Sequence, residues 1–68
     1  MNPEEMQQRV KQRRDDVYRE IRQSYRSVFK DVVSQASIVA LNNKMEIHVA
    51  AEVEYAMMSL ALDIIRRK

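Results

Sequence analysis

The sequence contains no glycine, and this absence limits which turns and binding loops the chain can form. Glycine takes up positive φ angles without steric cost, and the phosphate-cradling loops of P-loop and dinucleotide-binding proteins depend on it. Nucleotide binding of those kinds is therefore excluded. A tight hairpin would have to turn on asparagine, which tolerates positive φ, and Asn42-Asn43 is the one place that offers it.

The chain has 68 residues, no cysteine and one histidine. A domain of this size buries only about 60% of the surface that its unfolded form exposes, and no disulfide or cysteine-rich zinc site can stabilise it further. Cysteine nucleophiles and multi-histidine metal sites are excluded by composition. We therefore expect a single domain over residues 1–68 that associates with a partner and has no enzymatic activity, cofactor or metal.

The first half of the sequence predicts a long amphipathic helix over about residues 3–34. Asn2 is suited to cap its start, and Pro3 suits the first helical position, where its missing N–H costs nothing. Apolar residues then recur at steps of three, four or seven and share one helix face. These residues are Met6, Val10, Val17, Ile21, Tyr25, Val28 and Val32.

The opposite face of the predicted helix carries cations at steps of three and four, namely Arg19, Arg22, Arg26 and Lys30. Between Met6 and Lys30 there are eight Lys or Arg against three Asp or Glu. Guanidinium groups match phosphates in shape and charge, so these four residues are candidates for phosphate contacts, and a dimer would present two such stripes. The alternative explanation is that the stripe only keeps the outer helix face soluble.

The middle segment permits two folds. Pairing residues 36–41 with residues 44–49 across the Asn42-Asn43 turn gives one wholly apolar face, which is the pattern of a β-hairpin on a core. A continuous helix over 44–67 would place Glu46 on its most apolar face. We therefore expect the hairpin, and the alternative is an all-α helical hairpin that forms a dimeric four-helix bundle.

The last segment, about residues 51–67, predicts a helix whose apolar surface is wider than one stripe. A hairpin and one amphipathic helix can cover only part of that surface, so the rest is expected to contact a second copy or another protein. The candidate interface residues are Val53, Met57, Met58, Leu60 and Ile64. The expected fold is thus a dimeric α+β domain with the order α-β-β-α.

Short motifs accompany this order of elements: Ile-His-Val-Ala-Ala at 47–51, Tyr-Ala-Met-Met-Ser at 55–59, Asp-Ile-Ile-Arg at 63–66 and, before the turn, Asp-Val-Tyr-Arg-Glu-Ile at 16–21. Over residues 15–66 the pattern resembles the small dimerising subunit of the KEOPS tRNA-modification complex, whose first strand has no counterpart here. The resemblance implies a non-catalytic subunit that dimerises and supports the enzyme acting on tRNA.

Two functions follow from these features. The first is a small non-catalytic subunit that dimerises and acts as an interaction module within a complex that handles RNA, with itself, a paralogous small subunit or a larger enzyme subunit as partner. The second is a dimer that binds tRNA or other nucleic acid through the basic helix face. No apolar run is long enough to span a membrane and no signal peptide is evident, so a cytoplasmic protein is expected.

Overall fold

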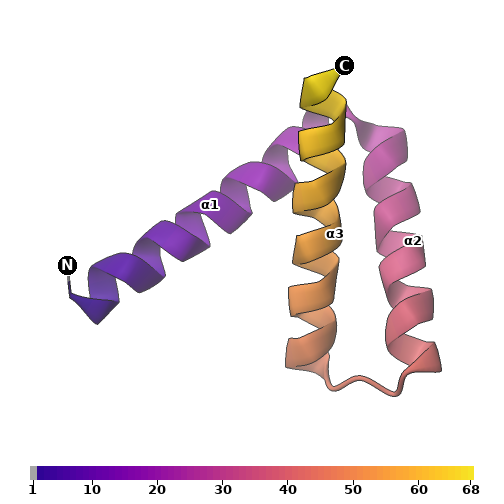
Figure 1. Cartoon of the computed structure of the whole chain (residues 1–68), viewed down its shortest axis with the longest axis horizontal. Coiled ribbons are helices and arrows are strands. Elements are labelled where there is room, and N and C mark those ends of the chain that lie inside the picture. Colours follow the sequence, from indigo (N-terminus) through magenta and orange to yellow (C-terminus); the bar gives the residue numbers. More distant parts are fainter. Residues whose placement is uncertain (1) are drawn as a thin grey trace.

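The computed structural model describes residues 2–68, and within them the chain forms three α-helices. They are α1 (Pro3–Ser24), α2 (Arg26–Asn42) and α3 (Ile47–Arg67). α2 and α3 run antiparallel and side by side, while α1 crosses α3 and its first half projects away from the other helices (Figure 1). The described residues form no strand, so the expected α+β class is wrong and the fold is all-α.

The start of α1 agrees with the sequence prediction. The side chain of Asn2 accepts the backbone N–H of Glu5 at 2.8 Å, and Pro3 occupies the beginning of the helix. Glu4 and Glu5 lie in the first turn, where carboxylates interact favourably with the positive end of the helix dipole.

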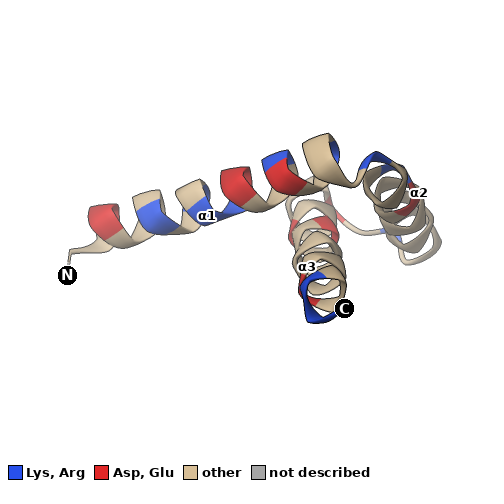
Figure 2. Cartoon of the chain, turned by 90° about the horizontal axis from the view of Figure 1, so that it is seen from above, with Lys and Arg blue, Asp and Glu red and all other residues tan. Residues whose placement is uncertain are grey.

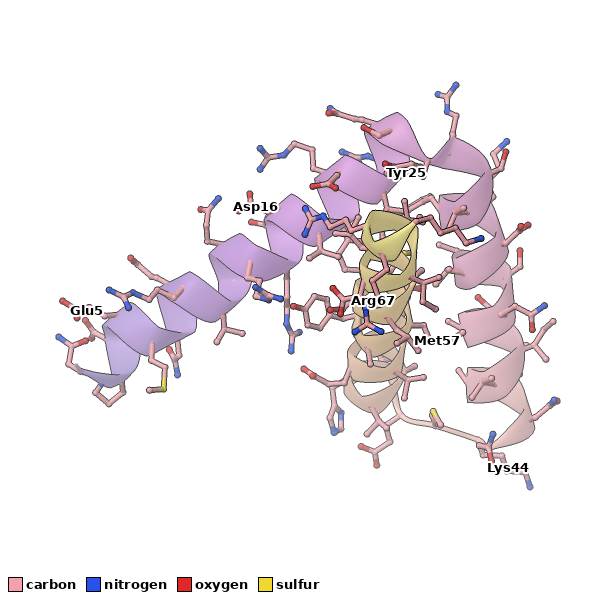
Figure 3. The ribbon with its side chains drawn as sticks, turned by 45° about the horizontal axis from the view of Figure 1, so that its top comes forward. Glu5, Asp16, Tyr25, Lys44, Met57 and Arg67 are labelled. Carbon is pink, nitrogen blue, oxygen red and sulfur yellow. The ribbon has the colours of Figure 1, made fainter. Side chains whose placement is uncertain are left out.

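The predicted single helix over 3–34 is wrong because the chain bends at Tyr25, which has φ −136° and ψ 59° (Figure 3). The bend costs few hydrogen bonds: the Tyr25 N–H donates to the Ile21 carbonyl at 2.8 Å, and the Tyr25 carbonyl accepts the Phe29 N–H at 2.9 Å. No proline or glycine lies nearby to cause it. The bend is caused by tertiary packing, because a straight helix could not pack both halves of its apolar stripe against α3.

The predicted β-hairpin is also wrong, because its two strands are helical residues joined by a short loop. Residues 36–41 belong to α2, and residues 44–49 form the end of the loop and the first turn of α3. Glu46, which a helix over residues 44–67 would place on its most apolar face, is the N-cap residue just before α3 and is exposed. The alternating residues 45–49 are too few to distinguish a strand from a helix. The helical state is favoured by the packing of α2 along α3, in which Ala36 is only 4% exposed.

The core lies where α1 crosses α3. Val17 and Ile21 of α1 pack there with Met58 and Leu62 of α3, and all four are buried. A rim of partly buried residues surrounds them: Tyr18, Val28, Phe29, Val32, Val33 and Tyr55. The core is small, and it depends on α1 reaching across the hairpin of α2 and α3.

The turn after α2 is a Schellman motif formed without glycine. The Met45 N–H donates to the Ala40 carbonyl at 3.0 Å, and the Lys44 N–H donates to the Leu41 carbonyl at 3.3 Å. The side-chain amide of Asn43 also donates to the Val39 carbonyl at 2.8 Å. Lys44 has φ 50°, the left-handed conformation that this motif usually assigns to glycine.

We expect Lys44→Gly to stabilise the chain by about 1 kcal/mol, because glycine adopts this φ angle without the steric penalty of a Cβ atom. Chemical denaturation followed by circular dichroism measures the change. Lys44→Ala is the control, since it removes the same exposed charge but keeps the Cβ atom. A glycine variant no more stable than the alanine variant would contradict the strain at Lys44.

No helix within residues 2–68 is both long and apolar enough to cross a membrane.

Candidate functional site

Polar contacts between α1 and α3 fix the angle at which the two helices cross. Arg14 donates a hydrogen bond to Glu52, the Tyr18 hydroxyl donates to Glu54 at 2.9 Å, and Arg66 of α3 donates to Glu20 of α1 at 2.6 Å. These three contacts span much of the length of α3. They therefore hold α1 in one orientation while the apolar core beneath provides most of the burial.

Aromatic rings line one side of this crossing. Tyr18 stacks on Tyr55 with ring centroids 6.4 Å apart, and its edge meets Phe29 at the same distance. The Arg14 guanidinium lies 4.9 Å from the Tyr55 ring centroid, a cation–π contact. Burial raises the pKa of Tyr18, and its hydrogen bond to Glu54 adds to the rise. Tyr18 and Tyr55 thus pack at the rim of the core and serve the fold.

The bend at Tyr25 divides the predicted basic stripe between two helices. Arg19 and Arg22 lie on the last turns of α1, whereas Arg26 and Lys30 lie on the first turns of α2 (Figure 2). All four side chains are exposed. Arg19 pairs with Asp16 at 3.4 Å, but the other three have no ion pair among residues 2–68. We call the surface formed by Arg22, Arg26 and Lys30 the basic end.

The start of α2 adds no carboxylate to the basic end. Tyr25 provides no side-chain cap there, and the first turn of α2 contains no acidic residue. The start of α1 is the opposite case, with a capping asparagine and two glutamates. The partial positive charge of this helix start is offset by the partial negative charge of the C-terminal end of α1 one residue earlier, so the cationic side chains themselves set the charge of the basic end.

The last turn of α3 lies at the same end of the molecule as the junction of α1 and α2, and the contact between Arg66 and Glu20 holds it there (Figure 1). Arg66 and Arg19 line the same surface groove although they are far apart in the sequence, and Arg67 and Lys68 follow at the end of the chain. The predicted phosphate contacts do not include Arg66, Arg67 or Lys68. The signal was available as a run of three consecutive cations, but their location depends on the packing of α3.

The five predicted interface residues of α3 fall into two groups. Met58 is fully buried in the core of its own chain, so its side chain is not on the surface. Leu60 and Ile64 are 61% and 49% exposed, and Val53 and Met57 are half-buried at the edge of the same surface. The helix thus has one apolar face against α1 and α2 and a second one toward solvent. We call the second one the open face of α3; it comprises Val49, Val53, Ala56, Leu60 and Ile64.

The remaining surface offers little for chemistry. A groove of about 370 Å³ runs beside the crossing of α1 and α3, and charges of both signs line it: Arg9, Arg13, Arg66, Asp16, Glu20 and Asp63. His48 lies on the surface with its Nδ1 atom 3.4 Å from a Glu46 carboxylate oxygen. Among residues 2–68 no three His, Asp or Glu side chains are grouped as metal ligands would be.

No protein-family model, curated protein or solved structure matches the chain. The relation to the KEOPS subunit therefore stays a prediction from the sequence motifs.

Proposed function

We propose that the chain binds the phosphate backbone of nucleic acid, without sequence preference, through the basic end. The observation that carries this proposal is a set of exposed cations without ion pairs on both sides of the junction of α1 and α2, namely Arg22, Arg26 and Lys30. Cations that serve only solubility are commonly interspersed with carboxylates, as they are on the outer side of α1. The proposed location of this activity is the cytoplasm, as expected from the sequence.

The number of cations sets the expected strength of binding. Three phosphate contacts to a duplex give a slope of about −2.7 for the logarithm of the binding constant against the logarithm of salt concentration. A fourfold increase in salt should then weaken binding by about 40-fold. Such an interaction is weak at physiological salt, with a Kd of about 10⁻⁴ to 10⁻⁶ M, and a second copy that offers a second basic end would strengthen it.

We expect the double variant R22E/R26E to lose binding to labelled duplex DNA and to tRNA, because the two substitutions replace attraction to phosphates with repulsion. Fluorescence anisotropy at low and at moderate salt measures the binding constant and its salt dependence. Circular dichroism verifies that the helices are intact, which is expected because both side chains are exposed and have no partner in the fold.

R9E/R13E is the matched control. These two arginines have the same spacing on a helix and are also exposed, and reversing them changes the net charge by the same amount. They lie on α1 beside the mixed-charge groove, away from the basic end. We expect this variant to retain most of the affinity. If both double variants bind equally weakly, overall charge and not the basic end determines binding, and the proposal is wrong.

A further inference from the structure

The chain exposes more surface than a compact protein of its mass. A folded monomer of 8.1 kDa has an accessible surface of about 4,500 Å² by size scaling. This chain exposes 5622 Å² and has a radius of gyration of 13.1 Å, where about 11 Å is expected for 68 residues. The excess of about 1,100 Å² is summed over the whole chain, the projecting half of α1 included, and each partner in an interface of standard size contributes roughly 800 Å².

The open face of α3 is the longest run of exposed apolar side chains in helical register among residues 2–68; Ile38 and Leu41 form a shorter one on α2. Another short one, Met6 and Val10, lies on the projecting half of α1. Residues of the open face recur at steps of four, three, four and four from Val49 to Ile64. This spacing is the seam of a helix that packs along another helix, and its centre carries no charge.

We propose that two copies of the chain associate through the open face of α3, with the two α3 helices antiparallel about a two-fold axis between Ala56 and Leu60. The inference is independent of nucleic-acid binding. Leu60 is the most exposed apolar residue of the open face, and Ala56, one turn earlier, is its smallest. The two-fold axis places Leu60 of each copy against Ala56 of the other, so that the large side chain fills the space left by the small one.

Charges at the two ends of the open face agree with an antiparallel arrangement. When Ala56 lies opposite Leu60, Val49 of one copy lies opposite Arg67 of the second. Arg67, which has no ion pair among the described residues, then comes within about one helical turn of Glu46 and Glu52 of the second copy. A parallel arrangement would instead bring equal charges together at each end, which is unfavourable.

Sedimentation equilibrium over a wide range of protein concentration tests the association. We expect the chain to reach twice its mass of 8.1 kDa and Leu60→Glu to remain at the monomer mass. Leu41→Glu is the control, because Leu41 is 77% exposed but lies on the outer side of α2; this variant should still dimerise. If the chain stays monomeric at every concentration, the proposal is wrong. A protein that uses this face for a different partner would behave in this way.

Ala56→Arg gives a second variant in case Leu60→Glu disturbs the fold. Ala56 is exposed and arginine is a good helix former, so the helix should persist while the larger side chain prevents Leu60 of the second copy from packing. Retained dimerisation in a folded Ala56→Arg variant contradicts the proposed contact.

The orientation has its own test, because the chain contains no cysteine. We expect a mixture of A56C and L60C chains to form the mixed disulfide in preference to either symmetric one. Efficient cross-linking of A56C to itself would show a parallel pair and overturn the antiparallel geometry.

Discussion

Ile21→Ala should destabilise the chain by about 2 to 5 kcal/mol, the usual cost of truncating a large aliphatic side chain in a core. Ile21 is fully buried between α1 and α3, and no neighbouring loop is available to collapse into the resulting cavity. The whole stability of a domain with 68 residues is about 3 to 10 kcal/mol, so the variant should be largely unfolded at the lower end of that range. Urea denaturation followed by circular dichroism measures the loss.

Ile38→Ala is the matched control for that experiment. Ile38 is 49% exposed on the outer side of α2, so the same chemical change should alter stability by no more than about 1 kcal/mol. Both variants must be compared at one protein concentration, since association adds to apparent stability. Equal losses in the two variants would mean that the core does not lie where α1 crosses α3.

Ile38→Pro should cost about 3 kcal/mol or more, because residue 38 lies in the interior of α2. Proline there removes a backbone donor, and its ring clashes with the preceding turn. The side chain of Ile38 is half exposed, so most of the loss comes from the backbone. Thermal unfolding followed by circular dichroism, with helix content read at low temperature, measures the effect.

Glu46→Pro provides the contrast. Glu46 precedes α3 with φ −69°, close to the angle that proline imposes, and its N–H has no backbone partner among the described residues. We expect it to be tolerated with little loss. In the β-hairpin that the sequence favoured, positions 38 and 46 would both lie within strands, and two equally damaging prolines would argue for that fold.

The two proposals concern different surfaces and can fail separately. R22E/R26E alters the basic end and leaves the open face of α3 intact, whereas Leu60→Glu does the reverse. In the antiparallel dimer the basic ends lie near opposite ends of the paired α3 helices, roughly 30 Å apart at a rise of about 1.5 Å per residue. Two basic ends can bind one nucleic acid molecule at the same time, which increases the affinity although each end makes the same phosphate contacts as before.

The sequence indicates which cations belong to the candidate site but not how they are arranged in space. The four cations of the basic stripe are visible in the sequence, but a straight helix would have aligned them in one row. The bend at Tyr25 instead divides them between α1 and α2 and leaves the start of α2 uncapped. Likewise the sequence indicated that α3 has too much apolar surface, yet it included Met58 with the interface because periodicity alone cannot say which side of a helix is already covered.

The sequence by itself determined the features that depend on neighbouring residues. The start of α1 at Asn2 and Pro3, the amphipathic stripe of that helix and the helical character of most of α3 follow from caps and periodicity within a few turns. Tertiary structure alone decided the bend at Tyr25, the helical state of residues 36–42 and the face of α3 that remains open. The physical reason is that a short apolar run fits the period of a helix and the period of a strand equally well. Its conformation is chosen by the burial gained against segments distant in the sequence, here the crossing of α1 over the hairpin of α2 and α3.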